Sequence, residues 1–64
     1  MSWEYVRNSE LNTYYVPRAS SLCEARDREA AFKKAFGEEI NVFIVSPFEW
    51  KIIEDRGKVE TLEV

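Results

Sequence analysis

The chain has 64 residues, of which 45% are hydrophobic and 33% charged, and a formal net charge of −3. This length allows one domain, residues 1–64, near the lower limit for folding without disulfides or metals. The sequence has no histidine, two glycines and one cysteine, Cys23. These counts exclude Ser-His-Asp and Cys-His catalysis, ordinary zinc sites, glycine-rich phosphate loops and an internal disulfide. We therefore expect a protein that is not an enzyme and binds no cofactor.

The expected location is the cytoplasm. A lone cysteine is typical of a reducing compartment. No apolar stretch of the sequence approaches the roughly 20 residues of a membrane helix. The N-terminal residues Met1–Glu4 lack the basic-then-apolar pattern of a signal peptide. The lack of a long apolar stretch predicts no membrane contact. Because the sequence begins at Met1 and carries no evident tag, we also expect a complete short gene product.

Two short strands are predicted at the start of the chain. Residues Trp3–Arg7 have a strand-like alternation, and Thr13–Val16 is β-branched and aromatic. The polar residues Asn8–Glu10 between them favour a turn, so the two strands should form a hairpin. Pro17 ends the hydrogen-bonding capacity of the second strand.

One helix is predicted near Ser21–Phe36. Ser21 and Glu24 have the spacing of a capping box, in which each side chain satisfies a free backbone N–H. No residue between them and Phe36 breaks a helix, and Gly37 supplies the left-handed residue that ends it. Phe32 and Phe36 lie within one arc of the helix and are the predicted anchors on the sheet.

The remainder of the chain has the composition of three more strands. Val42–Val45 is a continuous apolar run, which favours a strand in the sheet interior. Phe48–Ile53 shows alternating apolar positions. Asp55–Lys58 fits a hairpin loop with Gly57 at positive φ. Val59–Val64 has mixed charge, which suits a sheet edge.

The predicted fold class is therefore α+β in the order ββαβββ. It is an antiparallel sheet of four to five strands with a single helix packed on one face. One helix covers about three strands, because packed elements lie about 10 Å apart and neighbouring strands about 4.8 Å apart. The sequence has two Trp, three Tyr and four Phe residues, so some aromatic side chains should remain on the open face.

These aromatic residues motivate the predicted partner contact. Trp and Tyr dominate interface energetics because they bury a large area at low entropic cost. We expect contact through the sheet, centred on an aromatic residue near Trp50 and surrounded by charge. The candidate partner-binding residues are Trp3, Tyr15, Trp50, Lys51, Glu54 and Asp55. The alternative is that Trp50 lies in the core, because it occupies alternating positions with Phe48 and Ile52. In that case Trp3 or a tyrosine would be the central contact residue.

The adjacent carboxylates of the chain do not predict a catalytic or metal site. They occur at Glu38–Glu39 and Glu54–Asp55. Neighbouring residues of a strand point to opposite faces, which is poor geometry for a shared metal or acid–base site. We interpret both pairs as solvated charges.

The join between the second strand and the helix resembles a junction in known small proteins. Residues Val16–Ala25 form a strand end followed by the pattern A-x-[ST]-L-x-[EQ]-A. This is similar to small bacteriophage proteins that inhibit host machinery, namely certain anti-CRISPR proteins and podophage inhibitors of bacterial RNA polymerase. The resemblance implies one helix on a small antiparallel sheet and an inhibitory function. It carries over no binding residue.

The leading hypothesis is a non-enzymatic protein-binding module, encoded by a phage or mobile element. It would act in the host cytoplasm by occluding a surface of a host protein or protein complex. One alternative is a homodimeric structural or assembly protein whose uncovered sheet faces pair. Another is a nucleic-acid-binding protein, which would need a positive patch assembled from Arg7, Arg18, Lys51 and Lys58. The acidic net charge and the excess of carboxylates in residues 38–64 argue against nucleic acid.

Overall fold

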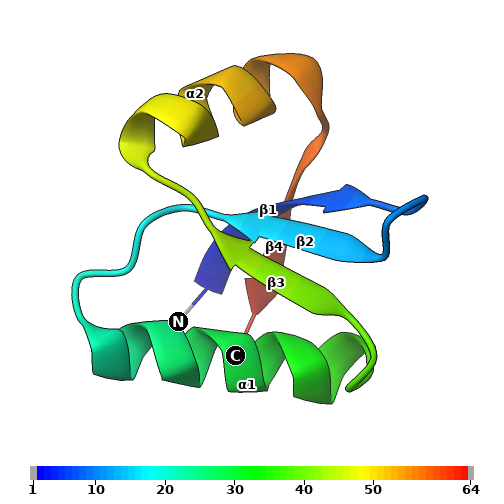
Figure 1. Cartoon of the computed structure of the whole chain (residues 1–64), viewed down its shortest axis with the longest axis vertical. Coiled ribbons are helices and arrows are strands. Elements are labelled where there is room, and N and C mark those ends of the chain that lie inside the picture. The colour runs from blue at the N-terminus through cyan, green and yellow to red at the C-terminus, as the bar shows by residue number, and fades with distance from the viewer. Residues whose placement is uncertain (1, 64) are drawn as a thin grey trace.

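Four strands and two helices make up the α+β structure of residues 2–63 in a computed structural model of the chain. The elements are β1 (Ser2–Asn8), β2 (Thr13–Val16), α1 (Leu22–Phe36), β3 (Asn41–Ile44), α2 (Pro47–Arg56) and β4 (Val59–Glu63). The strands form one sheet in the order β3-β2-β1-β4. Figure 1 shows α1 on one side of this sheet and α2 on the other. The predicted last strand included Val64, which lies outside the described residues.

β1 lies inside the sheet, with an antiparallel neighbour on each side. It pairs with β2 in the register Val6↔Tyr15 and with β4 in the register Val6↔Val59. The β1–β2 hairpin confirms the prediction. Its turn is closed by the Asn8 side-chain oxygen, which accepts the backbone N–H of Glu10 at 3.1 Å.

β2 and β3 are parallel, so the prediction of a purely antiparallel sheet is wrong at this pair. Their register places Tyr15 beside Phe43. Parallel neighbours need a long crossover connection. Here α1 supplies it by carrying the chain back along the sheet, so that β3 starts at the same end as β2 (Figure 1).

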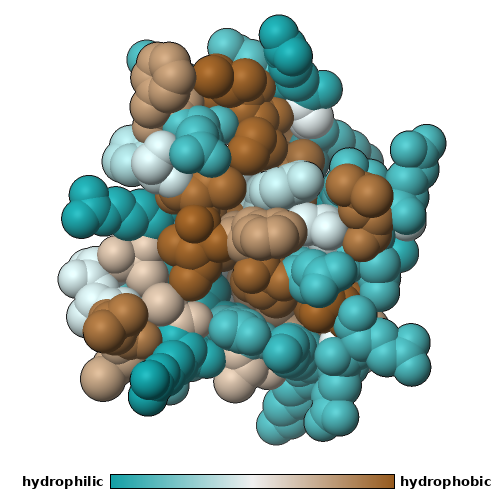
Figure 2. All heavy atoms as spheres, viewed as in Figure 1, coloured by the Kyte–Doolittle hydropathy of each residue, from teal (hydrophilic) through white to brown (hydrophobic). Residues whose placement is uncertain are grey.

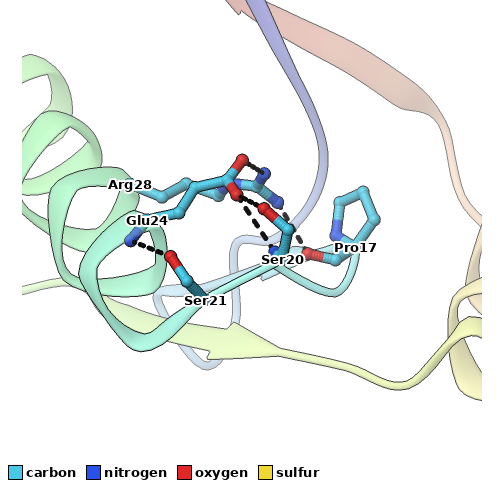
Figure 3. Close-up of polar contacts among 5 residues, drawn as sticks. All are labelled: Pro17, Ser20, Ser21, Glu24 and Arg28. Carbon is cyan, nitrogen blue, oxygen red and sulfur yellow. Dashed lines mark hydrogen bonds and ion pairs between the residues drawn. The ribbon is translucent and has the colours of Figure 1, made fainter.

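The start of α1 is held by a network of polar side chains (Figure 3). The Ser21 hydroxyl accepts the backbone N–H of Glu24 at 3.1 Å, as the capping box predicts. The Glu24 carboxylate accepts the backbone N–H of Ser20 at 3.0 Å, rather than that of Ser21, and also the Ser20 hydroxyl. Arg28 donates from Nη2 to Glu24 at 3.0 Å and from Nη1 to the Pro17 carbonyl at 2.7 Å. The network therefore ties the first turns of α1 to the end of β2.

Arg28 is a charged residue in the interior, only 7% exposed. Its guanidinium carbon lies 5.4 Å from the centre of the Trp3 ring, a cation–π geometry. Its Nε is buried without a hydrogen-bond partner in the part of the chain that the structure describes. A buried charge is tolerated when it is paired, which is the role of Glu24 and the Pro17 carbonyl.

Phe32 forms the centre of the core between α1 and the sheet. Its side chain is fully buried, and its ring packs edge-on against Tyr5, with the ring centres 5.2 Å apart. Trp3 and Tyr14 also contact it. Phe36 stacks on Tyr14 at 4.7 Å but remains 38% exposed. Phe32 is thus the main anchor of the helix and Phe36 lies at the rim of the core.

The predicted strand Phe48–Ile53 is instead the helix α2. Ser46 is its N-cap and accepts the backbone N–H of Glu49 at 3.3 Å, with Pro47 in the first turn. Proline suits this position because its fixed φ is already helical and its missing N–H would be unpaired there. These local start signals outweigh the alternation of Phe48, Trp50 and Ile52.

The buried residues of α2 follow a helical period. Trp50 and the partly buried Ile53 pack against Val6, Val45 and Tyr15, forming a second core on the face of the sheet opposite α1. The prediction of one helix and an open sheet face is therefore wrong, because α2 covers part of that face.

The structure also changes the interpretation of Gly57. The predicted positive φ is wrong, because the residue follows α2 in an extended conformation with φ of −117°. A Cβ atom at Gly57 would lie 2.6 Å from Cγ1 of Val6. The glycine is therefore needed for the close approach of the chain to β1.

β3 lies at an edge of the sheet, so the predicted interior position of Val42–Val45 is wrong. Only part of this apolar run is buried, because Phe43 and Ile44 are exposed. Ile40 and Val42 belong to the core under α1, and Val45 belongs to the core under α2. The apolar pattern of Val42–Val45 therefore reflects contributions of Val42 and Val45 to opposite faces of the sheet, and not a strand buried on both faces. β4 forms the other edge, as predicted.

We expect Phe32→Ala to lower the free energy of unfolding by about 3–5 kcal/mol, because it leaves a cavity at a fully buried position. Phe36→Ala is the matched control and should cost clearly less, since that ring is already 38% exposed. Urea unfolding followed by circular dichroism measures both values. Equal losses for the two variants would contradict the central position of Phe32.

A second expectation concerns acid stability. Hydrogen bonds from Ser20, and then the charge of Arg28, lower the pKa of Glu24 below its usual value. The ionised carboxylate therefore stabilises the fold above the unfolded pKa near 4.5, and this stabilisation is lost as the pH falls through the lower folded pKa. Glu24→Gln should be less stable than the parent at neutral pH and should lose less stability on acidification. Urea midpoints at neutral pH and at about pH 3 test this, and equal losses in both proteins would refute it.

Candidate functional site

The structure does not bring the six predicted contact residues onto one surface. Trp3 is half-buried on the α1 side of the sheet, stacked on Phe32 with ring centres 6.4 Å apart. Tyr15 is half-buried on the α2 side, where it packs against the second core. Trp50 is only 9% exposed and belongs to that core. The core alternative for Trp50 is therefore the one observed, and its ring offers little surface to a partner.

The three charged candidates do lie together. Lys51, Glu54 and Asp55 are all exposed on α2, at spacings of three and four residues that place them on one side of the helix. This side differs from the inward side of Trp50 and Ile53. The three residues therefore form a mixed-charge strip on the surface of α2.

A groove of about 690 Å³ lies between the β1–β2 hairpin end and the C-terminal half of α2. In Figure 1 the hairpin end lies at the right and α2 lies at the top. The residues that line the groove are Val6, Arg7, Asn8, Ser9, Glu10, Tyr15, Ile52, Ile53, Arg56 and Gly57. Apolar side chains of β1, β2 and α2 meet polar groups of the hairpin turn and Arg56 there, so the lining of this open groove is mixed.

Exposed apolar side chains continue from this groove along α2. Ile52 lines the groove and is 43% exposed, and Phe48, one helical turn earlier, is 77% exposed. We call the groove, which includes Tyr15 and Ile52, together with the neighbouring Phe48 the α2-side surface. Figure 2 shows hydrophobic residues gathered in the middle of the face that includes β3 and α2, with hydrophilic residues around them.

Sequence reasoning missed Phe48 and Ile52 as surface residues. The strand interpretation placed Phe48 and Ile52 on the same face as Trp50. All three side chains would then be buried, or all three exposed. A signal for the correct answer was present in Ser46-Pro47-Phe48-Glu49, which has the same S-x-x-E spacing as Ser21–Glu24. In a helix, Phe48 and Ile52 turn away from the side that carries Trp50 and Ile53.

The charges around the groove are mixed in sign. Arg56 and Glu10 both line it. Arg7 also lines it, but its guanidinium carbon lies 5.7 Å from the centre of the Tyr14 ring, on the α1 side of the sheet. Arg7 and Lys51 consequently project from opposite sides of the sheet. Two of the four residues proposed for a nucleic-acid-binding patch thus do not share a surface.

Within residues 2–63, no three acidic, cysteine or histidine side chains are grouped in a way that could hold a metal ion. Neither α1 nor α2, the helices of the described chain, combines the length and apolar character that crossing a bilayer requires. Cys23 is a free, exposed thiol in the first turn of α1.

Comparisons with protein-family models, with curated proteins and with solved structures found no significant match to this chain.

We expect the fluorescence of Trp50 to report a buried indole. In a Trp3→Phe variant, Trp50 is the remaining tryptophan, and its emission should be blue-shifted and resistant to iodide because the ring is only 9% exposed. A red-shifted emission that iodide quenches readily, in a variant with parental circular dichroism, would show that Trp50 is exposed and would restore it as a contact residue.

Proposed function

We propose that the chain is a non-enzymatic protein-binding module that contacts its partner through the α2-side surface. The observation that carries this proposal is the exposure of Phe48 and Ile52, one helical turn apart on α2, where Ile52 also lines the groove. Large apolar side chains that cluster on a surface next to a groove are characteristic of interaction sites. This site replaces Trp50, the anchor considered from sequence, with residues that are available to a partner.

The composition of the surroundings supports a protein partner. Interfaces combine an apolar, aromatic-rich centre with a polar rim. Here Phe48, Ile52 and Tyr15 supply the centre. Lys51, Glu54 and Asp55 on α2 are positioned to supply part of the rim. The mixed sign of these charges fits a protein surface better than the uniformly negative backbone of nucleic acid.

Occlusion of a host surface is a mode of action that suits a domain of this size. The whole chain exposes 4786 Å², and a typical interface buries about 800 Å² on each partner. One contact of standard size would engage about one sixth of this surface, so the chain is large enough to cover a partner site of ordinary size. The proposed role is therefore that of a cytoplasmic inhibitor, encoded by a phage or mobile element, that covers part of a host protein or protein complex.

We expect Phe48→Ser to weaken partner binding without unfolding the protein. The side chain is 77% exposed, so its removal should leave the core intact. Loss of a central aromatic contact typically costs about 2 kcal/mol or more, which is roughly a 30-fold lower affinity. The measurement is retention of bacterial lysate proteins on the immobilised chain, followed by titration of the retained partner.

Leu22→Ser is the matched control for this experiment. Leu22 is 80% exposed at the start of α1, away from the α2-side surface. A protein retained by the parent and by Leu22→Ser, but not by Phe48→Ser, supports the proposal. Equal retention by all three, with parental folding in each, would exclude the α2-side surface as the binding site.

A further inference from the structure

We infer that two copies of the chain pair edge to edge through β3, antiparallel, around a two-fold axis beside Phe43. This inference goes beyond the proposed function, because it concerns the open edge of the sheet rather than the α2-side surface. The pairing would join two four-stranded sheets into one continuous sheet, with both α2 helices on the same side.

The outer edge of β3 has backbone groups that pair with no other strand of residues 2–63. Asn41 donates its N–H to the Asn12 carbonyl, and Val45 donates to the Val16 carbonyl, each at 2.9 Å. Successive residues of a strand point their backbone groups alternately to the two sides. Residues 41, 43 and 45 therefore face β2, whereas the N–H and C=O groups of Val42 and Ile44 face outward. No strand of the described residues lies on that side of β3.

The two edges of the sheet are protected differently. β4 carries Glu60 and Glu63 and follows Lys58. Charges on an edge strand are a common means of preventing pairing with another chain. By contrast, residues 40–45 contain no charged side chain, and Phe43 and Ile44 are 55% and 38% exposed. β3 is therefore the edge that is suited to pairing.

A second copy fits this edge because its sequence is complementary to itself. Antiparallel alignment of the outward-facing residues pairs Val42 with Ile44 of the second copy, and each such pair exchanges both of its hydrogen bonds. Phe43 then lies opposite Phe43 of the second copy as a non-hydrogen-bonded pair, with the Cα atoms about 4.5 Å apart. Each Phe43 ring already stacks on Tyr15 of its own chain at 6.1 Å. The pairing would thus create a row of four aromatic rings.

The helix dipole of α2 also favours a second copy in this alignment, although Glu49 in the first turn of α2 is a like charge that opposes it. Glu38 and Glu39 are exposed just before β3. Antiparallel pairing brings the start of β3 near the end of β3 in the other copy, where Ser46 caps α2. The N-terminus of a helix carries a partial positive charge that attracts carboxylates. The two-fold axis makes this contact twice, and it places no like charges opposite each other within the strand.

The available area predicts a weak dimer. An aromatic side chain has about 150–250 Å² to bury, so the 55% exposure of Phe43 leaves about 100 Å² per copy for the interface. A four-residue strand with one such ring falls below the roughly 1,200 Å² of total buried area that stable complexes use. Dimers should therefore form at high protein concentration and dissociate on dilution.

Site-specific cross-linking tests the predicted alignment. The background is Cys23→Ser, because the native thiol is exposed. Phe43→Cys in this background should form a disulfide-linked dimer rapidly under mild oxidation, since the two residues meet at a separation that a disulfide spans. Ile44→Cys and Thr61→Cys are the controls, and both should link slowly. Ile44 faces Val42 rather than itself, and Thr61 lies on the β4 edge.

Each outcome of the cross-linking experiment decides the inference. Preferential linking at position 43 supports it. Equal rates at all three positions indicate random collision and overturn it, as does preferential linking at position 44 or 61. Measurement of molecular mass against concentration is independent of the cysteine variants. The measured mass should rise toward twice the monomer mass as the protein concentration increases. A mass that stays at the monomer value up to about 1 mM would overturn the inference.

A pair of lysine variants completes the test. Ile44 and Val59 are equally exposed, at 38%, on the two opposite edges. Ile44→Lys should abolish the mass increase, whereas Val59→Lys should preserve it. Loss of dimerisation in both variants, with parental circular dichroism, would contradict the choice of edge. A protein that is always monomeric but loses a lysate partner through Phe48→Ser would refute the dimer and leave the proposed function supported.

Discussion

The packing of Phe32 between α1 and the two middle strands is the contact on which the rest of the fold depends. Its ring is fully buried among aromatic side chains from β1 and β2. Because α1 is also the crossover that leads from β2 to β3, its position decides where β3 can pair. The same helix starts at the polar network of Glu24 and Arg28, which fixes its first turns against the end of β2. The contact of Phe32 with the sheet thus determines on which face of the sheet α1 packs. The buried Arg28 determines where α1 begins relative to β2.

Much of the first half of the fold could be predicted from sequence, because its signals are local. The turn at Asn8–Glu10, the caps at Ser21 and Gly37, and the apolar arc containing Phe32 each depend on residues close together in the chain. The second half could not be predicted in the same way. Phe48–Ile53 alternates like a strand, but its residues also satisfy a helix with Trp50 and Ile53 inward. The cap at Ser46 resolves this ambiguity, since hydrophobic period alone does not separate short helices from strands.

The candidate site was predicted less well than the fold for a related reason. Exposure depends on the register of a whole element, so one incorrect secondary-structure assignment exchanges buried and exposed residues. The segment was predicted as a strand but is a helix, and in this helix Trp50 is buried and Phe48 is exposed. Tyr15 was identified as a candidate and lines the groove. Its neighbours in the groove come from β1, the hairpin turn and α2, and only the tertiary structure reveals that these segments meet.

The position of β1 between β2 and β4 has a consequence for how the chain folds. The pairing with β2 closes only a short turn, whereas the pairing of Ser2 with Glu63 joins opposite ends of the described chain. Closing a long loop loses more chain entropy than closing a short one, and contacts distant in sequence slow folding. We therefore expect the β1–β2 hairpin to form early and the β1–β4 pairing to form after α1, β3 and α2 have shortened the loop. β1 thus pairs with one strand that is close to it in sequence and with one that is at the opposite end of the described chain.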